Sequence, residues 1–294
     1  PQIREVCHAL IDNFIENPQV DLLNEFAIPL PVTVIADILG VDRADMWTFK
    51  HWGDLMISGN IDVLSHEKRR DVARAVVDLH NYFVPRIEQR RITPTDDLLS
   101  EMVNAQIDGE PALTTEELLP IIDQILLAGH ETTTNLIGNG MLVLLNDPAL
   151  MARLTQQPED IPAMVEEVLR WDAPIQCTYR RATAEGSING VAIAKGSMVI
   201  PAWAGANWDP KAFENPEIFN IDRPAGKTHM GFGYGPHFCA GAELARLEAR
   251  IAFETLLERL TAFSLDHEAS DLTRIASFAA QGYTRVIMNF SART

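Results

Sequence analysis

The chain of 294 residues is 47% hydrophobic and 22% charged, a composition typical of one large soluble domain or two small ones. Its formal net charge of −17 argues against nucleic acid as a partner. The three cysteines, at positions 7, 177 and 239, are too widely spaced for a disulfide framework or a CxxC metal site, which suits a reducing cytoplasm, and no apolar run approaches the ~18 residues of a membrane span.

The first third of the chain is predicted to be helical. Apolar residues recur at helical spacing over residues 2–16, 33–40, 42–57 and 66–91. Pro29 and Pro31 are expected to break the chain before the second of these helices, and Gly40 to end it as a C-cap. Pro85 lies inside the fourth helix and predicts a kink or a break there.

A long helix is predicted in the middle of the chain. Thr114 and Glu117 form the pattern of a capping box, and helical periodicity runs from there to Asn146. Because this helix is apolar nearly all round, we expect it to be buried. Its middle, residues 128–134, reads Ala-Gly-His-Glu-Thr-Thr-Thr, and such residues are unfavourable inside a buried helix. This conflict predicts a kink and a function.

The second half of the chain combines helices with small sheets. We expect two helices within residues 148–172, a hairpin with an Asn-Gly turn over 187–193, a strand over 197–203, a loop over 207–224 and a β-like tail around 286–288. No internal repeat or flexible linker interrupts the sequence. The pattern therefore predicts one mainly α-helical domain over residues 1–294.

A segment rich in glycine leads to the last cysteine of the chain. Glycines alternate at positions 231, 233 and 235, so the backbone can turn tightly, and Pro236 stiffens the turn. From Ala240 onward, good helix formers predict a helix. Cys239 would then lie at a helix N-terminus, where the macrodipole and free N–H groups favour a thiolate. Such a thiolate suits a metal-centred cofactor.

Residues 232–241, Phe-Gly-Tyr-Gly-Pro-His-Phe-Cys-Ala-Gly, resemble the haem-ligand loop of the cytochrome P450 family, the haem-thiolate monooxygenases. The resemblance implies a mainly α fold, with a long central helix over the haem and small β-sheets, and haem b as the cofactor. It makes Cys239 the iron ligand, and Phe232, Gly233 and Gly241 cofactor-binding residues. Since family members usually carry further N-terminal helices, it implies a truncated member that holds about three quarters of the fold.

The middle of the long helix resembles the family's oxygen-activation motif. By that resemblance Thr132 and Glu131 are catalytic: Thr132 hydrogen-bonds the oxygen that is being activated, and Glu131 gates protons from solvent. Ala128 and Gly129 adjoin the haem, and Gly129 thins the helix so that dioxygen fits. A lone threonine usually bonds back to its own helix, but the six-residue match from Ala128 to Thr133 favours the functional interpretation.

Glu167 and Arg170 share one helical face and resemble the family's ExxR element. Alone such a pair is a weak signal, because exposed ion pairs contribute little to stability. Its position before the hairpin and the cysteine loop gives it weight. The resemblance adds Arg223, and we interpret the trio as structural rather than catalytic.

Haem propionates require cationic or hydrogen-bonding partners. By the resemblance these are His237 and Arg180. Arg181 is the neighbouring alternative, and the spacing to Ala182-Thr183 favours Arg180. For either arginine, a surface charge without a ligand is the other interpretation.

The substrate space is placed by the same resemblance. Its lining would include Asp123, Leu126, Leu127, Ile175, Gln176 and Phe278. Mostly apolar walls imply a small hydrophobic substrate, although the same residues would equally suit a protein core.

Electrons must come from a separate protein, because the sequence contains no flavin or iron–sulfur motif. The resemblance implies a ferredoxin-type partner, dioxygen as co-substrate, and a cytoplasmic monomer of the soluble bacterial type. Arg223, Lys227, Arg246 and Arg250 cluster around Cys239 in sequence and predict a basic patch that steers an acidic ferredoxin.

Other classes fit the sequence less well. A zinc hydrolase motif needs a second histidine at position 134, where threonine stands, and a dinucleotide-binding motif needs glycine in place of Phe238. A cysteine nucleophile needs a spatially separate base, and His237 is too near in sequence. The alternative is a non-catalytic haem protein, a sensor or carrier with the same thiolate. Glu131 and Thr132 argue against it and against a peroxide-driven enzyme, because neither needs a proton relay.

Overall fold

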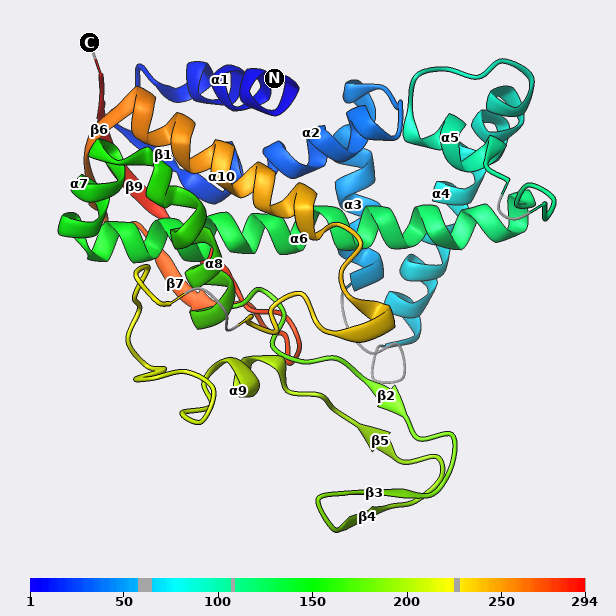
Figure 1. The fold of residues 1–294 in the computed structure, drawn as a ribbon. Coiled ribbons are helices and arrows are strands. Elements are labelled where there is room, and N and C mark those ends of the chain that lie inside the picture. Colours follow the sequence, from blue (N-terminus) through cyan, green and yellow to red (C-terminus); the bar gives the residue numbers. More distant parts are fainter. Residues whose placement is uncertain (58–64, 107–108, 225–227, 294) are drawn as a thin grey trace. The chain divides into compact units, whose positions relative to one another are not determined.

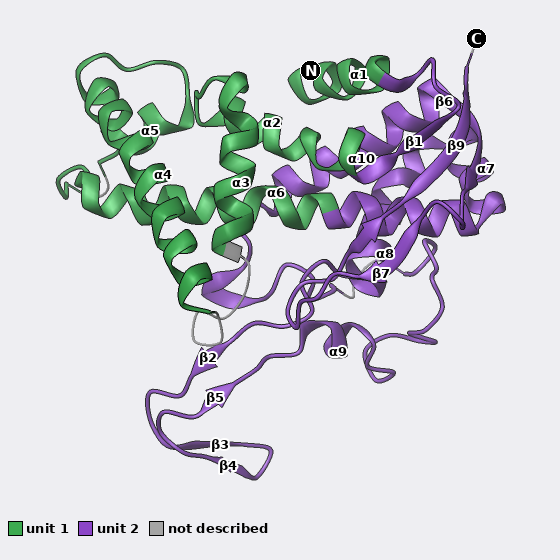
Figure 2. Ribbon diagram, turned by 180° about the vertical axis from the view of Figure 1, so that it is seen from behind, with its two compact units in different colours: residues 1–13, 24–134 green, residues 14–23, 135–294 purple. Residues whose placement is uncertain are grey.

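The computed structural model describes residues 1–57, 65–106, 109–224 and 228–293 (Figure 1). Contacts within the chain group it into two compact units (Figure 2). Unit 1 comprises Pro1–Asn13 and Asn24–Thr134, and unit 2 comprises Phe14–Leu23 and Asn135–Thr294. That the whole chain forms one haem-binding domain stays a prediction.

Helices dominate the described residues, which confirms the mainly helical class. They are α1 Gln2–Phe14, α2 Pro29–Ile38, α3 Met46–Ile57, α4 His66–Ile92, α5 Leu98–Asn104, α6 Thr115–Asn146, α7 Pro148–Gln156, α8 Ile161–Trp171, α9 Trp203–Asn207 and α10 Ala242–Arg259. A π-helical turn spans Leu23–Ala27, and 3₁₀ turns span Arg43–Asp45, Pro158–Asp160 and Gly235–His237. No described helix combines the length and the hydropathy that a membrane crossing requires.

The strands are short, and all belong to unit 2. They are β1 Gln19–Asp21, β2 Arg180–Arg181, β3 Gly186–Ile188, β4 Val191–Ile193, β5 Met198–Val199, β6 Leu260–Leu265, β7 Asp271–Arg274, β8 Tyr283–Arg285 and β9 Ile287–Ala292. An antiparallel sheet in the order β1-β9-β6 pairs Val20 with Met288, and three two-stranded ladders pair β2 with β5, β3 with β4, and β7 with β8.

Helix α2 begins earlier than the sequence analysis predicted. Pro29 and Pro31 lie in its first turn, where a missing N–H costs no helical hydrogen bond, so they start the helix instead of breaking the chain before it. Its end is as predicted: Gly40 has a φ of 66°, its N–H donates to Asp37, and the next N–H donates to the carbonyl of Ala36. This pair of bonds is a Schellman C-cap. Pro85 does not interrupt α4.

The long helix α6 is confirmed and continuous. The N–H of Thr114 donates to Glu117 Oε2 over 2.9 Å, and the N–H of Glu117 donates to Thr114 Oγ1 over 3.3 Å, which is the predicted capping box. The helix has 32 residues and is about 48 Å long. Its part up to Thr134 belongs to unit 1 and the remainder to unit 2. Burial on all sides is limited to residues 133–142, whereas Ile121 is exposed.

Three predicted elements of unit 2 can be compared with the structure. Asn189 and Gly190, with φ of 49° and 81°, make the predicted hairpin turn between β3 and β4. The strand predicted over 197–203 is only Met198–Val199, because Pro201 has no N–H to donate to a ladder. Helix α10 begins at Ala242, two residues later than predicted, with Gly241 as its N-cap.

Each unit has its own buried core. In unit 1, Leu79 and Phe83 of α4 and Leu118 and Ile122 of α6 are almost fully buried. The core of unit 2 includes Phe253 and Leu256 of α10, Val168 of α8 and Met288 of β9. Large apolar side chains removed from water supply the main free energy that holds each unit together.

We predict that Gly40→Ala destabilises the protein more than Gly109→Ala. Both glycines have positive φ, so alanine carries a backbone cost of about 1–2 kcal/mol at either position. A Cβ at Gly40 would also collide with the Asp97 carboxylate, which Arg90 holds in place at 2.8 Å, whereas a Cβ at Gly109 meets no atom within 4 Å. Urea unfolding of both variants measures the difference, and equal losses would contradict the packing argument.

Candidate functional site

The loop before α10 presents Cys239. Gly233 and Gly235 have φ of 72° and 76°, so the glycines take the left-handed backbone that the tight turn requires. The N–H of Cys239 donates to the carbonyl of Phe232 over 3.0 Å, and its carbonyl accepts from the N–H of Ala242 over 3.3 Å. These two bonds tie the cysteine backward to the start of the loop and forward to α10.

Cys239 is the exposed cysteine of the chain, whereas Cys7 and Cys177 are buried. Burial raises the pKa of the Cys177 thiol, which keeps that side chain protonated. The Cys239 thiol instead lies exposed, three residues before an α-helix of 18 residues whose N-terminus favours negative charge. Of the three thiols, Cys239 therefore fits a metal-bound thiolate best.

Several residues of unit 2 assigned to the cofactor have the chemistry that a planar apolar group with carboxylate arms requires. Next to it Phe238 is 47% exposed, and Tyr234 in the same loop is 76% exposed. His237 is also exposed, and Arg180 in β2 is exposed with its guanidinium bonded to the backbone carbonyl of Tyr179. Exposed aromatic rings, a thiol, an imidazole and a guanidinium are the groups that a haem would engage.

A buried ion cluster forms where the sequence analysis placed a structural trio. Arg170 donates to Glu167 through two nitrogens, each over 2.8 Å, and Arg223 Nε donates to Glu167 Oε1 over 2.9 Å. The side chains of Glu167 and Arg170 are 5% and 2% exposed. A buried carboxylate shared by two guanidiniums is an expensive arrangement unless every polar atom is paired.

The remaining donors of this cluster hold the irregular segment between α9 and α10. Arg170 Nη1 donates to the carbonyls of Asn207 and Pro216, and Arg170 Nη2 to that of Ile218. Arg223 donates to the carbonyls of Glu214, Asn215 and Ile218. The guanidiniums therefore replace the regular backbone partners that this segment lacks.

The sequence analysis missed a second polar cluster. Glu166 accepts from Arg246 Nε over 2.6 Å and Nη2 over 3.1 Å, and its Oε2 lies 3.0 Å from His229 Nε2. Burial of Glu166 opposes ionisation, but the bonds from His229 and Arg246 outweigh it and lower the pKa of Glu166 to about 2. The only indication in the sequence was Glu166 itself, an acidic residue directly before Glu167 of the ExxR element.

In unit 1, the polar segment of α6 is satisfied largely by backbone carbonyls. Thr132 Oγ1 donates to Ala128 over 2.8 Å, and Thr134 Oγ1 donates to Ala27 over 2.9 Å. Gly129 is needed for packing, because a Cβ there would lie 2.6 Å from a methyl carbon of Ile35 in α2. That Gly129 also makes room for dioxygen stays a prediction.

Glu131 lies beside further titratable groups of unit 1. Burial raises the pKa of Glu131, and the nearby Asp54 carboxylate raises it further. Asp54 accepts from Lys50 over 2.6 Å and lies 3.7 Å from His130 Nε2. Although burial of Asp54 opposes ionisation, His130 and Lys50 lower its pKa. Glu131 is thus a carboxyl group that binds a proton more readily than an exposed glutamate does.

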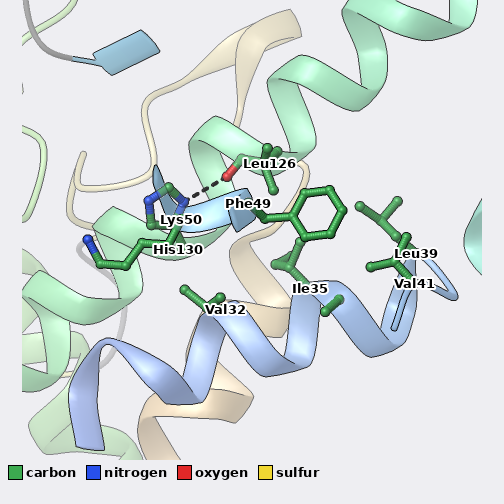
Figure 3. A pocket seen from close by; sticks show the side chains of 9 residues that line it. Val32, Ile35, Leu39, Val41, Phe49, Lys50, Leu126 and His130 are labelled. Atoms are coloured by element: carbon green, nitrogen blue, oxygen red, sulfur yellow. Dashed lines mark hydrogen bonds between the residues drawn. The ribbon is translucent and has the colours of Figure 1, made fainter. Parts of the chain in front are cut away.

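Two residues predicted to line the substrate space have other partners in unit 1. Asp123 is paired with His80 of α4 at 2.9 Å. Leu126 is buried and lines a small cavity of about 10 Å³, room for a single water molecule (Figure 3). The cavity is lined by Val32, Ile35, Ala36, Leu39, Val41, Phe49, Lys50, Leu126 and His130. Asp123 and Leu126 therefore contribute to the interior of unit 1. Leu127 is half-buried.

The predicted lining residues of unit 2 do come together. Ile175 pairs with Ala280 in an isolated antiparallel bridge, and the N–H of Gln176 donates to the carbonyl of Ala279 over 2.7 Å. Phe278 is 71% exposed, and its ring lies 6.4 Å from that of Tyr179. Two segments about a hundred residues apart therefore form one partly apolar surface.

The predicted basic patch is not formed by the described arginines. Arg223 is paired with Glu167, Arg246 with Glu166 and Glu243, and Arg250 with Glu254. Each of the three arginines is bonded to a carboxylate, which weakens the positive charge that it could present to a partner. The fourth member, Lys227, lies outside the described residues.

The sequence pattern of the Cytochrome P450 family matches residues 42–278. The chain is 37% identical over 282 residues to 6-deoxyerythronolide B hydroxylase of Saccharopolyspora erythraea, a match that covers 96% of this chain and 68% of the relative. It is 36% identical over 275 residues to the cytochrome P450 monooxygenase PikC of Streptomyces venezuelae, which covers 92% of this chain and 64% of that one.

Solved structures agree with the sequence relatives. CYP109E1 from Bacillus megaterium in complex with testosterone superimposes with a TM-score of 0.90 at 35% identity, covering 98% of this chain and 78% of that one. The chain therefore belongs to the cytochrome P450 family of haem-containing monooxygenases. It spans about two thirds of the length of the curated relatives it matches.

We predict that Glu167→Gln destabilises the protein strongly. The substitution leaves Arg170 and Arg223 without their carboxylate in a buried position, which typically costs about 3–5 kcal/mol. The matched control is Asp222→Asn, which removes the carboxylate that pairs with Arg153 at the surface and should cause a much smaller loss. Urea unfolding followed by circular dichroism measures both, and similar losses would contradict the role given to the buried trio.

Proposed function

We propose that the protein is a haem-thiolate monooxygenase that inserts one atom of dioxygen into a small hydrophobic substrate. One C–H bond, one dioxygen molecule, two electrons and two protons give one alcohol and one water. The observation that carries the proposal is the exposed Cys239 thiol in a glycine-turned loop before α10, in a chain of the P450 family.

The ligand and the propionate partners are proposed residue by residue. Cys239 would bind haem iron as a thiolate, and His237 and Arg180 would hold the propionates. When bound, haem supplies the iron at which dioxygen is reduced and activated. Gly233 and Gly241 would let the loop approach the cofactor closely, since a Cβ at Gly241 would meet only the Cys239 sulfur, at 3.9 Å. Phe232 would support the loop through its carbonyl, which accepts from the N–H of Cys239.

The protons would be handled by two side chains of α6. Thr132 directs its hydroxyl hydrogen to the carbonyl of Ala128, so Thr132 Oγ1 keeps lone pairs with which it can accept a hydrogen bond from water. Glu131 has a raised pKa, and a carboxyl group poised closer to neutral pH is better suited to take up and release protons. Together they would hold and pass the protons that the reaction consumes.

The substrate and the electron donor are proposed by class. CYP109E1 is described with testosterone and with corticosterone, and another relative is named as a hydroxylase of 6-deoxyerythronolide B. A hydrophobic substrate of this kind suits the exposed Phe278 and the half-buried Ile175. A ferredoxin-type protein would deliver the electrons.

The ligand is tested by substitution of each cysteine. We predict that the reduced carbon-monoxide complex of the wild-type protein shows the absorption band that defines the family, and that Cys239→Ser abolishes it. Cys7→Ser and Cys177→Ser, at buried positions, should leave the band in place. A normal band in Cys239→Ser would refute the proposed ligand.

The proton-handling role is tested by Thr132→Ala. With a reductase and a ferredoxin supplied, the variant should keep consuming NADPH but release hydrogen peroxide instead of hydroxylated product, because the water held by Thr132 is lost. Positioned proton transfer is typically worth about 10²–10⁴-fold, so the loss of product should be large. Glu131→Ala should instead slow the whole cycle.

The control is Thr133→Ala, because the next residue points about 100° away around the helix. If Thr133→Ala uncouples and Thr132→Ala does not, the helix register of the assignment is wrong. If neither variant uncouples while both bind haem, the proton-handling role given to Thr132 is wrong.

A further inference from the structure

Two adjacent carboxylates on α8 face two different clusters. Glu167 points to Arg170 and Arg223, which hold the segment after α9. Glu166 points to His229 and Arg246, which lie at the two ends of the segment that carries Cys239. Because both acids come from one turn of one helix, the segment before the cysteine and the cysteine loop itself are fixed to the same rigid element.

One branch of the second cluster reaches the backbone of the loop through a histidine. The N–H of Gly231 donates to His229 Nδ1 over 3.0 Å, so Nδ1 is an acceptor and the ring proton lies on Nε2. From Nε2, His229 donates to Glu166 over 3.0 Å. Gly231 also lies tightly against α8, since a Cβ there would be 2.6 Å from the carbonyl oxygen of Leu169.

The other branch reaches a side chain of the loop. The guanidinium of Arg246 lies over the ring of Phe232, 4.7 Å from its centroid, while two of its nitrogens donate to Glu166. Between the two branches, the N–H of Met230 donates to Oδ1 of the fully buried Asn207 over 2.6 Å. Met230, Gly231 and Phe232 are therefore each held by a polar contact.

Cys239 depends on this anchored end because its own surroundings hold it weakly. Residues 234–241 are all exposed, so packing does little to fix them. The Cys239 N–H instead donates to the carbonyl of Phe232, the residue on which Arg246 stacks. A displacement of Phe232 would therefore move the cysteine backbone directly.

We propose that Glu166, His229 and Arg246 form a clamp that positions Cys239 for thiolate ligation, although none of the three touches the reacting atoms. The clamp is the Glu166–His229–Gly231 line together with the Glu166–Arg246–Phe232 line, and it rests on the proposed function of Cys239. It holds the first half of the loop rigid, so that the sulfur is presented in one place with little loss of conformational entropy when the cofactor binds.

The carboxylate at the centre of the clamp is ionised. Glu166 stays ionised well below neutral pH, because His229 and Arg246 both donate to it. Hydrogen bonds to charged groups are stronger than neutral ones, so replacing this carboxylate by an amide of the same shape weakens both branches at once. Arg246→Lys is the complementary change: it keeps the positive charge but loses the flat fork and the stacking on Phe232.

The experiment measures two quantities separately in the full chain: the rigidity of the loop and the ligation of the iron by the thiolate. In the haem-free protein, hydrogen exchange at the amides of Gly231 and Cys239 should become about tenfold faster in Glu166→Gln and in Arg246→Lys. In the haem-loaded protein, the same variants should lose part of the thiolate band of the reduced carbon-monoxide complex at a pH where the wild-type protein shows it in full.

The matched control is Asp160→Asn, which removes a carboxylate bonded to Arg153 at 2.8 Å just before α8. It should leave both the loop exchange and the thiolate band at wild-type values. If Glu166→Gln and Arg246→Lys behave like Asp160→Asn, the clamp is overturned, even if they lower the unfolding temperature. If Glu166→Gln fails to fold, Arg246→Lys alone decides. A wild-type protein without the thiolate band would overturn the proposed function and the clamp with it.

Discussion

A buried carboxylate on α8 determines how the irregular part of unit 2 is held. Glu167 is nearly inaccessible to water, so its charge must be matched by donors within the protein, and Arg170 and Arg223 provide them. The guanidiniums have more donors than one carboxylate can use, and the surplus binds backbone carbonyls of the segment after α9. An ion cluster thus substitutes for secondary structure where the chain has almost none.

The clamp around Glu166 extends the same principle to the loop before α10. Glycine allows that loop to turn, but glycine also makes it entropically costly to order. The loop is exposed, so packing does not offset this cost, and polar contacts from α8 and α10 do so instead. Glu166, His229 and Arg246, which would hold the loop, are therefore distinct from Cys239, His237 and Arg180, which would touch the cofactor.

Helix α6 has to accommodate polar residues in its middle. Its middle contains polar and β-branched residues that disfavour a buried helix, yet the helix is continuous. His130 Nδ1, Thr132 Oγ1 and Thr134 Oγ1 each donate to a backbone carbonyl without a break in the helix, whereas His130 Nε2 is buried without a hydrogen-bond partner among the described residues. Gly129 is explained by the close approach of Ile35, which no pattern within α6 could reveal.

The sequence by itself determined what depends on neighbours along the chain: the capping box at Thr114, the Asn189-Gly190 turn, the C-cap at Gly40 and the glycine loop before Cys239. It also identified the family, because the loop and the long helix carry specific local motifs. Prolines were misjudged where their position in the element mattered, since Pro29 starts a helix and Pro201 shortens a strand.

Only the tertiary structure decided which charges meet. The position of a glutamate in the sequence cannot show whether the cation that it pairs with is four or eighty residues away, because many pairings satisfy the same periodicity. Thus Arg246 was expected in an open basic patch and is instead bound to Glu166, and Asp123 was expected at a substrate wall and is bound to His80. The physical reason is that burial compels each charge to find a partner, and the choice of partner is made by the packing of whole elements.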